Sequence, residues 1–204
     1  MSEFDLKAKS WDTPSKIERA QSIADALRSK VSLSKKMSAF EYGCGTGLLS
    51  FELKDELGPI TLADSSEGML DVVRDKIKSG SVTDMKPVNL DLSKDSLPEE
   101  RFDIVYTMMT LHHITDTQQI LEQFHAILNT GGYLCIADLD KEDGSFHGHH
   151  VHDVHKGFDR GDLAEKATKA GFTDVVFTTA YKLTKEVEDD SQTFPIFLMA
   201  AKKG

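Results

Sequence analysis

The chain has 204 residues, with 24 Lys and Arg against 34 Asp and Glu, so its formal net charge is −10. This length supports one domain with a sizeable core. The charge makes nucleic acid a poor partner, because backbone binding neutralises phosphates with Lys and Arg. Two cysteines argue against a secreted disulfide scaffold. The first ten residues lack a signal-peptide core, and no run reaches the roughly 18 apolar residues of a membrane span. We therefore expect a cytoplasmic protein without a membrane partner.

An N-terminal arm precedes the main part of the chain. Asp12-Thr13-Pro14 predicts a helix start, since proline is favoured in the first helical turn. Apolar residues then recur at helical spacing as far as Val31. We divide the chain into a helical arm or lid, residues 1–34, and a single main domain, residues 35–204.

Strands and helices alternate from residue 38 onward. Residues 38–58 hold a first strand, a glycine-rich loop and a first helix. Further strands are predicted near 59–64, 85–90, 102–108, 133–137, 174–181 and 194–201. Further helices are predicted at 67–79, 115–128 and 159–171. The alternation predicts an α/β fold with a parallel sheet and helices on both faces.

Two connections stand out in this scheme. The polar stretch 138–158 is longer than an ordinary connection, which suggests a functional loop or lid. The acidic stretch 185–190 is predicted to form the tip of a closing hairpin.

The loop Gly43-Cys44-Gly45-Thr46-Gly47 is the strongest local signal. Glycines let a ligand approach the main chain, and the N–H groups that open the next helix face that ligand. The spacing G-x-G-x-G differs from the dinucleotide fingerprint G-x-G-x-x-G, and no lysine follows as in a Walker loop. Asp64 ends the next predicted strand, where an acid can accept hydrogen bonds from a ribose diol. Asp64 alone does not choose between adenosyl cofactors.

Five segments in order resemble the motifs of class I S-adenosylmethionine-dependent methyltransferases. They are Glu41 to Gly47, Ala63 to Leu70, Asn89 to Leu92, Phe102 to Ile114, and Leu128 to Leu134. The resemblance implies a Rossmann-like domain whose seven-stranded sheet has the order 3-2-1-4-5-7-6, with strand seven antiparallel. It also implies that the N-terminal arm covers the site as a lid.

The resemblance further implies S-adenosylmethionine as cofactor. Its site would comprise Trp11, Glu41, Gly43, Cys44, Gly45, Gly47, Asp64, Ser65, Met69, Asp91, Leu92 and Met108. Glu41 would face the ammonium group, directly or through water, and Asp64 would hold both ribose hydroxyls. Asp91 would take the adenine amino group, with the Leu92 backbone nearby, and Ser65 and Met69 would flank the ring.

Structural alternatives accompany these roles. Glu41 could act as a buttress, Asp64 as a helix cap, and Asp91 as the cap of a turn before Ser93. Trp11 could simply anchor the arm to the core. Cys44 and Cys135 are interpreted as packed residues rather than nucleophiles.

Histidines are the candidate acceptor-side residues. The predicted fourth strand ends in Met108 to His113 instead of the Asn-Pro-Pro-Tyr element of amino-methylating enzymes. Imidazole titrates near neutral pH, so His113 is a candidate base, with helix capping as the alternative. A second group comprises His147, His149, His150, His152 and His155. Its glycines and its lack of cysteine argue for a loop without a metal, from which His150 and His155 could face the substrate.

We therefore predict methyl transfer to oxygen or nitrogen of a small-molecule acceptor by a monomer or homodimer. One alternative is a catalytically silent methyltransferase-like binding or activator subunit. Another is a nicotinamide-dependent oxidoreductase, which the glycine spacing disfavours.

Overall fold

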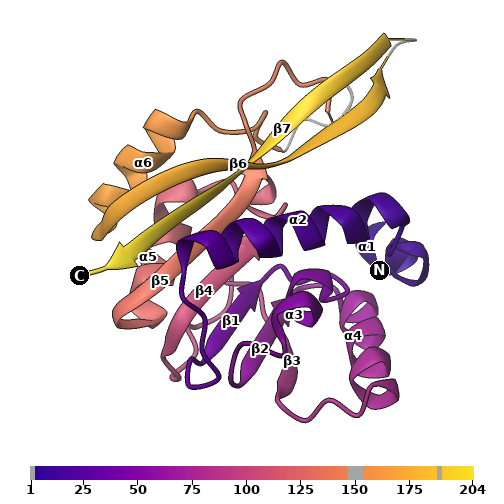
Figure 1. Cartoon of the computed structure of the whole chain (residues 1–204), viewed down its shortest axis with the longest axis vertical. Coiled ribbons are helices and arrows are strands. Elements are labelled where there is room, and N and C mark those ends of the chain that lie inside the picture. Colours follow the sequence, from indigo (N-terminus) through magenta and orange to yellow (C-terminus); the bar gives the residue numbers. More distant parts are fainter. Residues whose placement is uncertain (1–2, 147–153, 188–189) are drawn as a thin grey trace.

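A seven-stranded sheet forms the centre of the molecule (Figure 1). The computed structural model describes residues 3–146, 154–187 and 190–204. The strands are β1 (Ala39–Tyr42), β2 (Ile60–Asp64), β3 (Met85–Asn89), β4 (Phe102–Met108), β5 (Leu128–Leu139), β6 (Phe172–Val187) and β7 (Asp190–Lys203). Their order is β3-β2-β1-β4-β5-β7-β6, with β1 to β5 parallel and β7 antiparallel to both neighbours. The predicted fold class and strand order are confirmed.

Helices connect the strands, and α4, α5 and α6 begin at capping side chains. They are α1 (Glu3–Lys7), α2 (Pro14–Lys30), α3 (Leu48–Leu53), α4 (Glu67–Ser79), α5 (Thr117–Ile127) and α6 (Arg160–Lys169), with 3-10 turns η1 (Ala8–Ser10) and η2 (Leu111–His113). Ser66, Asp116 and Asp159 each accept backbone N–H groups at the starts of α4, α5 and α6. No helix of the described residues is both long and apolar enough to cross a bilayer.

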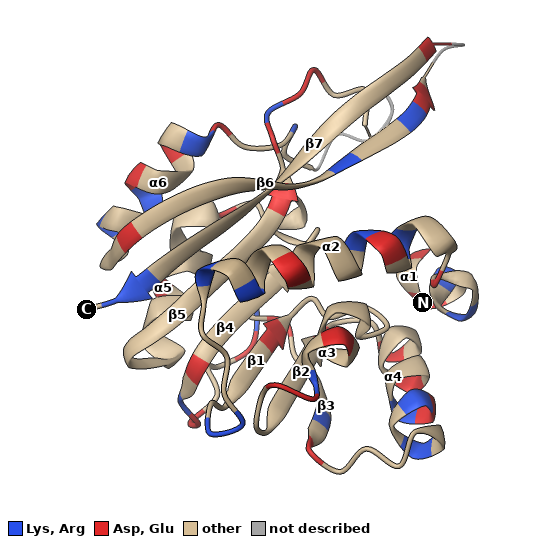
Figure 2. Cartoon of the chain, viewed as in Figure 1, with Lys and Arg blue, Asp and Glu red and all other residues tan. Residues whose placement is uncertain are grey.

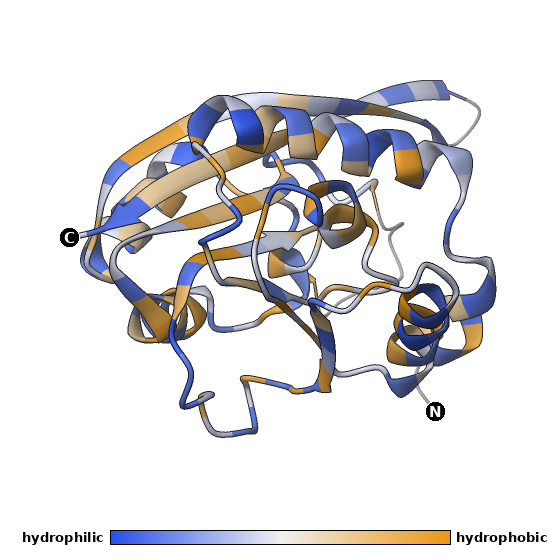
Figure 3. Ribbon diagram, turned by 60° about the horizontal axis from the view of Figure 1, so that its bottom comes forward, coloured by the Kyte–Doolittle hydropathy of each residue, from blue (hydrophilic) through white to orange (hydrophobic). Residues whose placement is uncertain are grey.

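The sheet buries both of its faces. Successive residues of β4 point to opposite sides: Tyr106 joins the core under α2, α3 and α4, and Val105 joins the core under α5 and α6. The middle strands are accordingly hydrophobic along much of their length (Figure 3). Both acidic and basic residues occur along α2, α4 and α6 (Figure 2). The sheet is therefore packed between two cores, which fix the positions of its strand ends.

The last three strands are longer than predicted. β5 starts at Leu128 rather than near Tyr133. The β6–β7 pairing continues from Lys182↔Pro195 to Val187↔Asp190, so the predicted hairpin tip at 185–190 is wrong for its described residues, which lie in strands. An antiparallel ribbon satisfies its own backbone hydrogen bonds, and polar side chains do not stop it.

The N-terminal arm is tied to the start of α4. Asp5 accepts hydrogen bonds from the Ser66 hydroxyl (2.5 Å) and from the Gly68 N–H (3.1 Å). A Cβ added at Gly68 would lie 2.9 Å from Asp5 Cα, so glycine permits this close approach. The prediction missed α1, which has only five residues. That the arm opens and closes as a lid remains a proposal.

Candidate cofactor and acceptor site

A cavity of about 650 Å³ opens at the carboxyl ends of β1, β2 and β4. Tyr42, Asp64 and Met108 are the last residues of these strands, and all three line it. β1 pairs with β2 on one side and β4 on the other, which is the switch in strand order where open α/β sheets bind ligands. Phe4 and Trp11 of the N-terminal arm close one side.

The glycine loop follows β1 in a conformation that L-residues rarely adopt. Gly43, Gly45 and Gly47 have φ values of +65°, +54° and +78°. A Cβ added at Gly43 would lie 2.2 Å from Thr110 Cγ2, while the Thr110 hydroxyl donates to the Gly43 carbonyl at 3.1 Å. The loop is thus pressed against the end of β4, with Gly43 and Gly45 at the cavity. Gly47 lies behind them as the N-cap of α3 and is not a lining residue.

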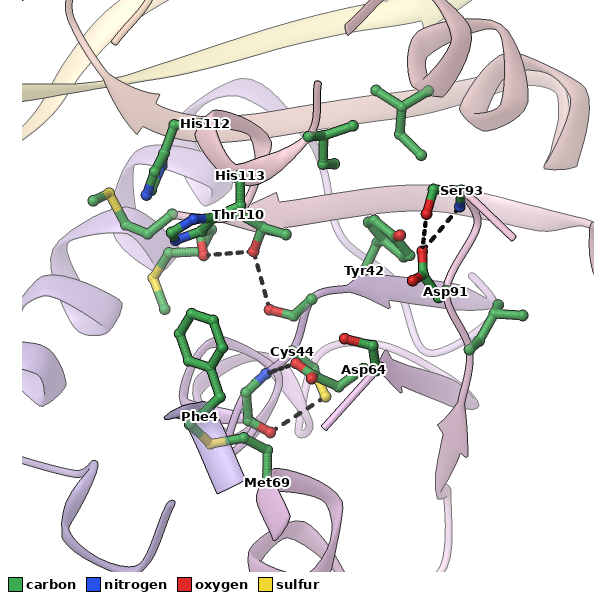
Figure 4. Close-up of a pocket in the computed structure, with 18 of the residues that line it drawn as sticks. Phe4, Tyr42, Cys44, Asp64, Met69, Asp91, Ser93, Thr110, His112 and His113 are labelled. Atoms are coloured by element: carbon green, nitrogen blue, oxygen red, sulfur yellow. Dashed lines mark hydrogen bonds between the residues drawn. The ribbon is translucent and has the colours of Figure 1, made fainter. Parts of the chain in front are cut away.

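Asp64 lies beside this loop and lines the cavity (Figure 4). One carboxylate oxygen accepts the Gly45 N–H at 2.7 Å, and the other accepts the Ser66 N–H at 2.8 Å. Burial raises the pKa of Asp64 although these backbone hydrogen bonds oppose the shift. Each oxygen keeps further acceptor capacity in a wall of the cavity. Two hydroxyl groups of a ligand would therefore match the two oxygens of the Asp64 carboxylate.

Asp91 lines the cavity and also caps the turn that follows it. It accepts the Ser93 N–H at 3.0 Å and the Lys94 ammonium at 2.6 Å. Burial would raise its pKa, but the hydrogen bonds from Lys94 and Ser93 prevail and lower it. The capping alternative therefore describes part of what Asp91 does. Leu92 is buried outside the lining, and its N–H donates to the Tyr42 hydroxyl at 3.1 Å.

Glu41 lies beneath the cavity rather than in its wall. Its side chain accepts a hydrogen bond from Ser50, and Ser50 Oγ lies 2.7 Å from the Tyr106 hydroxyl. The residue is 1% exposed, and burial raises its pKa to about 8. This position favours the buttress interpretation over direct contact with an ammonium group.

The remaining predicted cofactor residues reach the cavity. The lining includes Trp11, Cys44, Ser65, Met69 and Met108. Burial raises the pKa of the Cys44 thiol well above its usual value and that of Cys135 to about 12. Because the thiolate is the reactive form, neither cysteine suits a nucleophile.

The three predicted catalytic histidines differ in position. His113 lines the cavity, with its ring 5.6 Å from that of Phe4. His155 does not: its ring nitrogen Nε2 donates to the Ile114 carbonyl at 2.9 Å, which supports the turn after β4. Its position argues against the catalytic role that we predicted. His150 lies outside the described residues, as do His147, His149 and His152.

His112 and Asp138 form a buried pair that the sequence analysis did not select. His112 Nδ1 lies 2.7 Å from Asp138 Oδ1, and the two residues are 2% and 0% exposed. His112 also lines the cavity (Figure 4). The sequence did contain one signal for this pair. Asp138 directly follows the predicted strand 133–137, whose last residue pairs with Met108 at the end of β4.

Arg19 was also missed. It is 8% exposed and lines the cavity from α2. It precedes Ile23 by four residues and Leu27 by eight, so helical spacing alone places it on the buried face. Lys16, one turn earlier, lines the cavity as well.

No group of three or more metal-ligating side chains occurs in the part of the chain that the structure describes. The fold and the cavity at the strand switch together define the class: an open α/β domain that binds a ligand beside a glycine loop.

Comparisons with known proteins relate part of the chain to methyltransferases. Residues 39–132 match the model described as a methyltransferase domain. An uncharacterized methyltransferase of Schizosaccharomyces pombe is 33% identical over 119 residues, which cover 55% of this chain and 42% of that protein. The demethylmenaquinone methyltransferase of Listeria welshimeri is 28% identical over 112 residues, 53% of this chain and 48% of that one. The chain thus spans about half the length of the curated relatives it matches.

The fold comparison agrees with the sequence comparison. The structure of a SAM-dependent methyltransferase from Aquifex aeolicus gives a TM-score of 0.73 at 18% identity, over 98% of each chain. The matched domain model, the relatives and the shared fold support a class I S-adenosylmethionine-dependent methyltransferase.

Proposed function

We propose that the protein transfers a methyl group from S-adenosylmethionine to an oxygen or nitrogen of a small-molecule acceptor. The observation that carries this proposal is one shared cavity. Asp64 and the glycine loop line one part of it, and His112 and Met109 line another. The demethylmenaquinone methyltransferase among the relatives supports an acceptor of small-molecule size.

The residues present fit an adenosyl cofactor. Gly43 and Gly45 offer main chain without side chains, and Asp64 offers two partly buried acceptor oxygens for a diol. Ser65 and Met69 would flank the adenine, and Asp91 would bind its amino group. When bound, the cofactor supplies an electrophilic methyl group on a sulfonium. Glu41 supports the loop through Ser50 at the start of α3.

His112 is the best-oriented base in the cavity. With the Nδ1 proton donated to Asp138, the neutral ring can accept a proton only at Nε2. Asp138 also accepts the Leu139 N–H at 2.7 Å, so its carboxylate is held in place. A base of this kind contributes about 10²–10⁴-fold when the acceptor must lose a proton. His113 is the second candidate, because it also lines the cavity.

Alignment and exclusion of water account for the rest of the chemistry. Phe4 and Trp11 of the arm bring apolar surface over the cavity, with their rings 5.8 Å apart. Holding two reactants in line can remove about 7–11 kcal/mol of a barrier. We therefore propose that the arm, residues 1–34, acts as the lid of the site.

A silent binding subunit is the second candidate function. It would keep the cofactor part of the cavity and have no acceptor chemistry. The oriented His112–Asp138 pair favours the enzyme, because a silent site has no need of a positioned imidazole.

Transfer of a labelled methyl group tests the proposal. The protein would be incubated with methyl-labelled S-adenosylmethionine and a panel of phenols, amines and carboxylates, with RNA and protein as parallel substrates. Labelled small-molecule product, lost in Asp64→Ala, supports the proposal. Turnover on RNA or protein alone contradicts the acceptor class, and cofactor binding without any turnover supports the silent subunit.

A further inference from the structure

Arg19 carries a buried charge whose inaccessible Nε finds no hydrogen-bond partner in the part of the protein that the structure describes. It makes no ion pair with a described carboxylate, whereas Arg28 on the same helix pairs with Asp25 and Glu56. An unpaired buried charge is costly, so a site that keeps one needs a reason.

The surroundings of Arg19 increase this cost. Burial lowers the pKa of Arg19, and Asp138 and Tyr181 offset it only through longer-range attraction. Lys16 lies three residues earlier on α2 and lines the same cavity, and its pKa is lowered by burial and by the charge of Arg19. Two cations thus share this wall.

The position of Arg19 favours the acceptor over the cofactor. Asp12, just before α2, binds Thr46 of the glycine loop, and Lys76 pairs with Asp12. Arg19 lies further along the helix, and the groups that act on its charge belong to β5 and β6. It therefore lies on the side of the cavity where His112 is held by Asp138.

We propose that Arg19 binds an anionic group of the methyl acceptor, a carboxylate or a phosphate. This inference rests on the proposed methyl transfer and names its substrate class. A guanidinium presents parallel N–H donors that match either oxyanion, and a desolvated pair of this kind is stronger than a neutral hydrogen bond. Lys16 adds a second positive charge to the wall. The anion would hold the acceptor while His112 faces the atom to be methylated.

Binding of simple anions tests the proposal. Benzoate, phenyl phosphate and inorganic phosphate would be titrated into the protein with and without S-adenosylhomocysteine, with benzyl alcohol as neutral control. The variants are Arg19→Met, Arg19→Lys and the matched Arg28→Met. We expect saturable anion binding that Arg19→Met weakens at least about tenfold and Arg28→Met leaves within about twofold. Benzoate against phenyl phosphate then separates carboxylate from phosphate.

The stability of the ligand-free protein gives an independent readout. Because Arg19→Met removes an unpaired buried charge, its melting temperature should rise by about 2–4 °C. A lower melting temperature would show that Arg19 supports the fold, which overturns the proposal. Arg19→Lys should fold and keep the charge, yet bind anions more weakly than the wild type.

The other outcomes are equally decisive. No anion binding by the wild type, or binding that Arg19→Met does not change, overturns the proposal. A tenfold loss of S-adenosylhomocysteine affinity in Arg19→Met would assign Arg19 to the cofactor's own carboxylate and also overturn it. Anion binding through Arg19 without any cofactor binding would support the anion site while the methyl-transfer proposal fails.

Discussion

The two halves of the cavity are built in different ways. In the cofactor half, defined by Gly43, Gly45 and Asp64, protein hydrogen bonds engage the polar groups, and the backbone is shaped by glycine. In the acceptor half, defined by Arg19, Met109 and His112, a buried guanidinium nitrogen lacks a hydrogen-bond partner within residues 3–146, 154–187 and 190–204. Met109, although not glycine, has a φ of +55°.

This difference shows where the molecule stores unfavourable energy. A left-handed non-glycine residue costs of order 1–3 kcal/mol and persists only where the surroundings hold it, here through the Met109 N–H to the Ala137 carbonyl at 2.8 Å. Strain and unpaired charge occur together on the acceptor side. We propose that the cofactor half is preorganised and that a bound acceptor completes the other half.

Replacing His112 should produce the largest effect on the acceptor half. His112→Gln removes the proposed base, so turnover should fall about 10²–10⁴-fold while cofactor affinity stays nearly unchanged. The measurements are single-turnover methyl transfer and calorimetric titration with S-adenosylhomocysteine. His113→Gln is the matched control, and a large loss there with normal turnover in His112→Gln would move the base to His113.

Replacing Gly43 should produce the largest effect on the cofactor half. Gly43→Ala combines a left-handed backbone with a Cβ 2.2 Å from Thr110, so unfolding free energy should drop by about 2–4 kcal/mol. Gly131→Ala is the matched control, because Gly131 has a φ of +78° but nothing within 4 Å of the added Cβ. Urea unfolding compares the two variants. Equal losses of unfolding free energy in the two variants would show that Thr110 moves away from the added Cβ without lowering stability.

Removing the Asp64 carboxylate tests cofactor recognition and should have a smaller effect than Gly43→Ala. Asp64→Ala should weaken S-adenosylhomocysteine binding by about 1–3 kcal/mol, because it removes charged acceptors for the ribose hydroxyls. Asp71→Ala, on the exposed face of α4, should bind as the wild type does. Unchanged affinity in Asp64→Ala would refute this assignment.

Replacing Glu41 should produce an effect that depends on pH. The ordinary pKa of a glutamate is 4.5 and that of Glu41 in the folded protein is about 8, so between these values the folded state binds a proton that the unfolded chain has lost. Stability due to this group therefore falls as pH rises, by up to about 1.4 kcal/mol per unit. Glu41→Gln should remove that slope in urea unfolding from pH 5 to 8. Glu165→Gln, at an exposed position, should retain the pH dependence of stability. Identical pH dependence in the two variants would contradict the buried position of Glu41.

The parallel part of the fold could be predicted from local patterns. Predictions for α2, α4 and β4 match the structure closely, because helical and strand periodicity is strong there. The ends of β6 and β7 could not be read, since pairing with a neighbouring strand continues through polar residues. The short helix α1 is held by Asp5 contacts with Ser66 and Gly68, which no local pattern records.

The same contrast applies to the site. The glycine loop and Asp64 occur in contiguous motifs, so the sequence predicted residues that now line the cavity. Arg19, His112 and Asp138 come from three separate segments and meet only in the folded chain. Helical periodicity marks the apolar positions of α2 and does not single out Arg19 among them.

Calorimetric titration of the purified protein with S-adenosylmethionine, S-adenosylhomocysteine and NADH tests the central claim most directly. We expect saturable binding of both sulfur compounds at one site, competition between them, and no binding of NADH. Absence of binding by either sulfur compound, or a preference for NADH, would contradict the assignment of the glycine loop and Asp64 to a methyl-donor site.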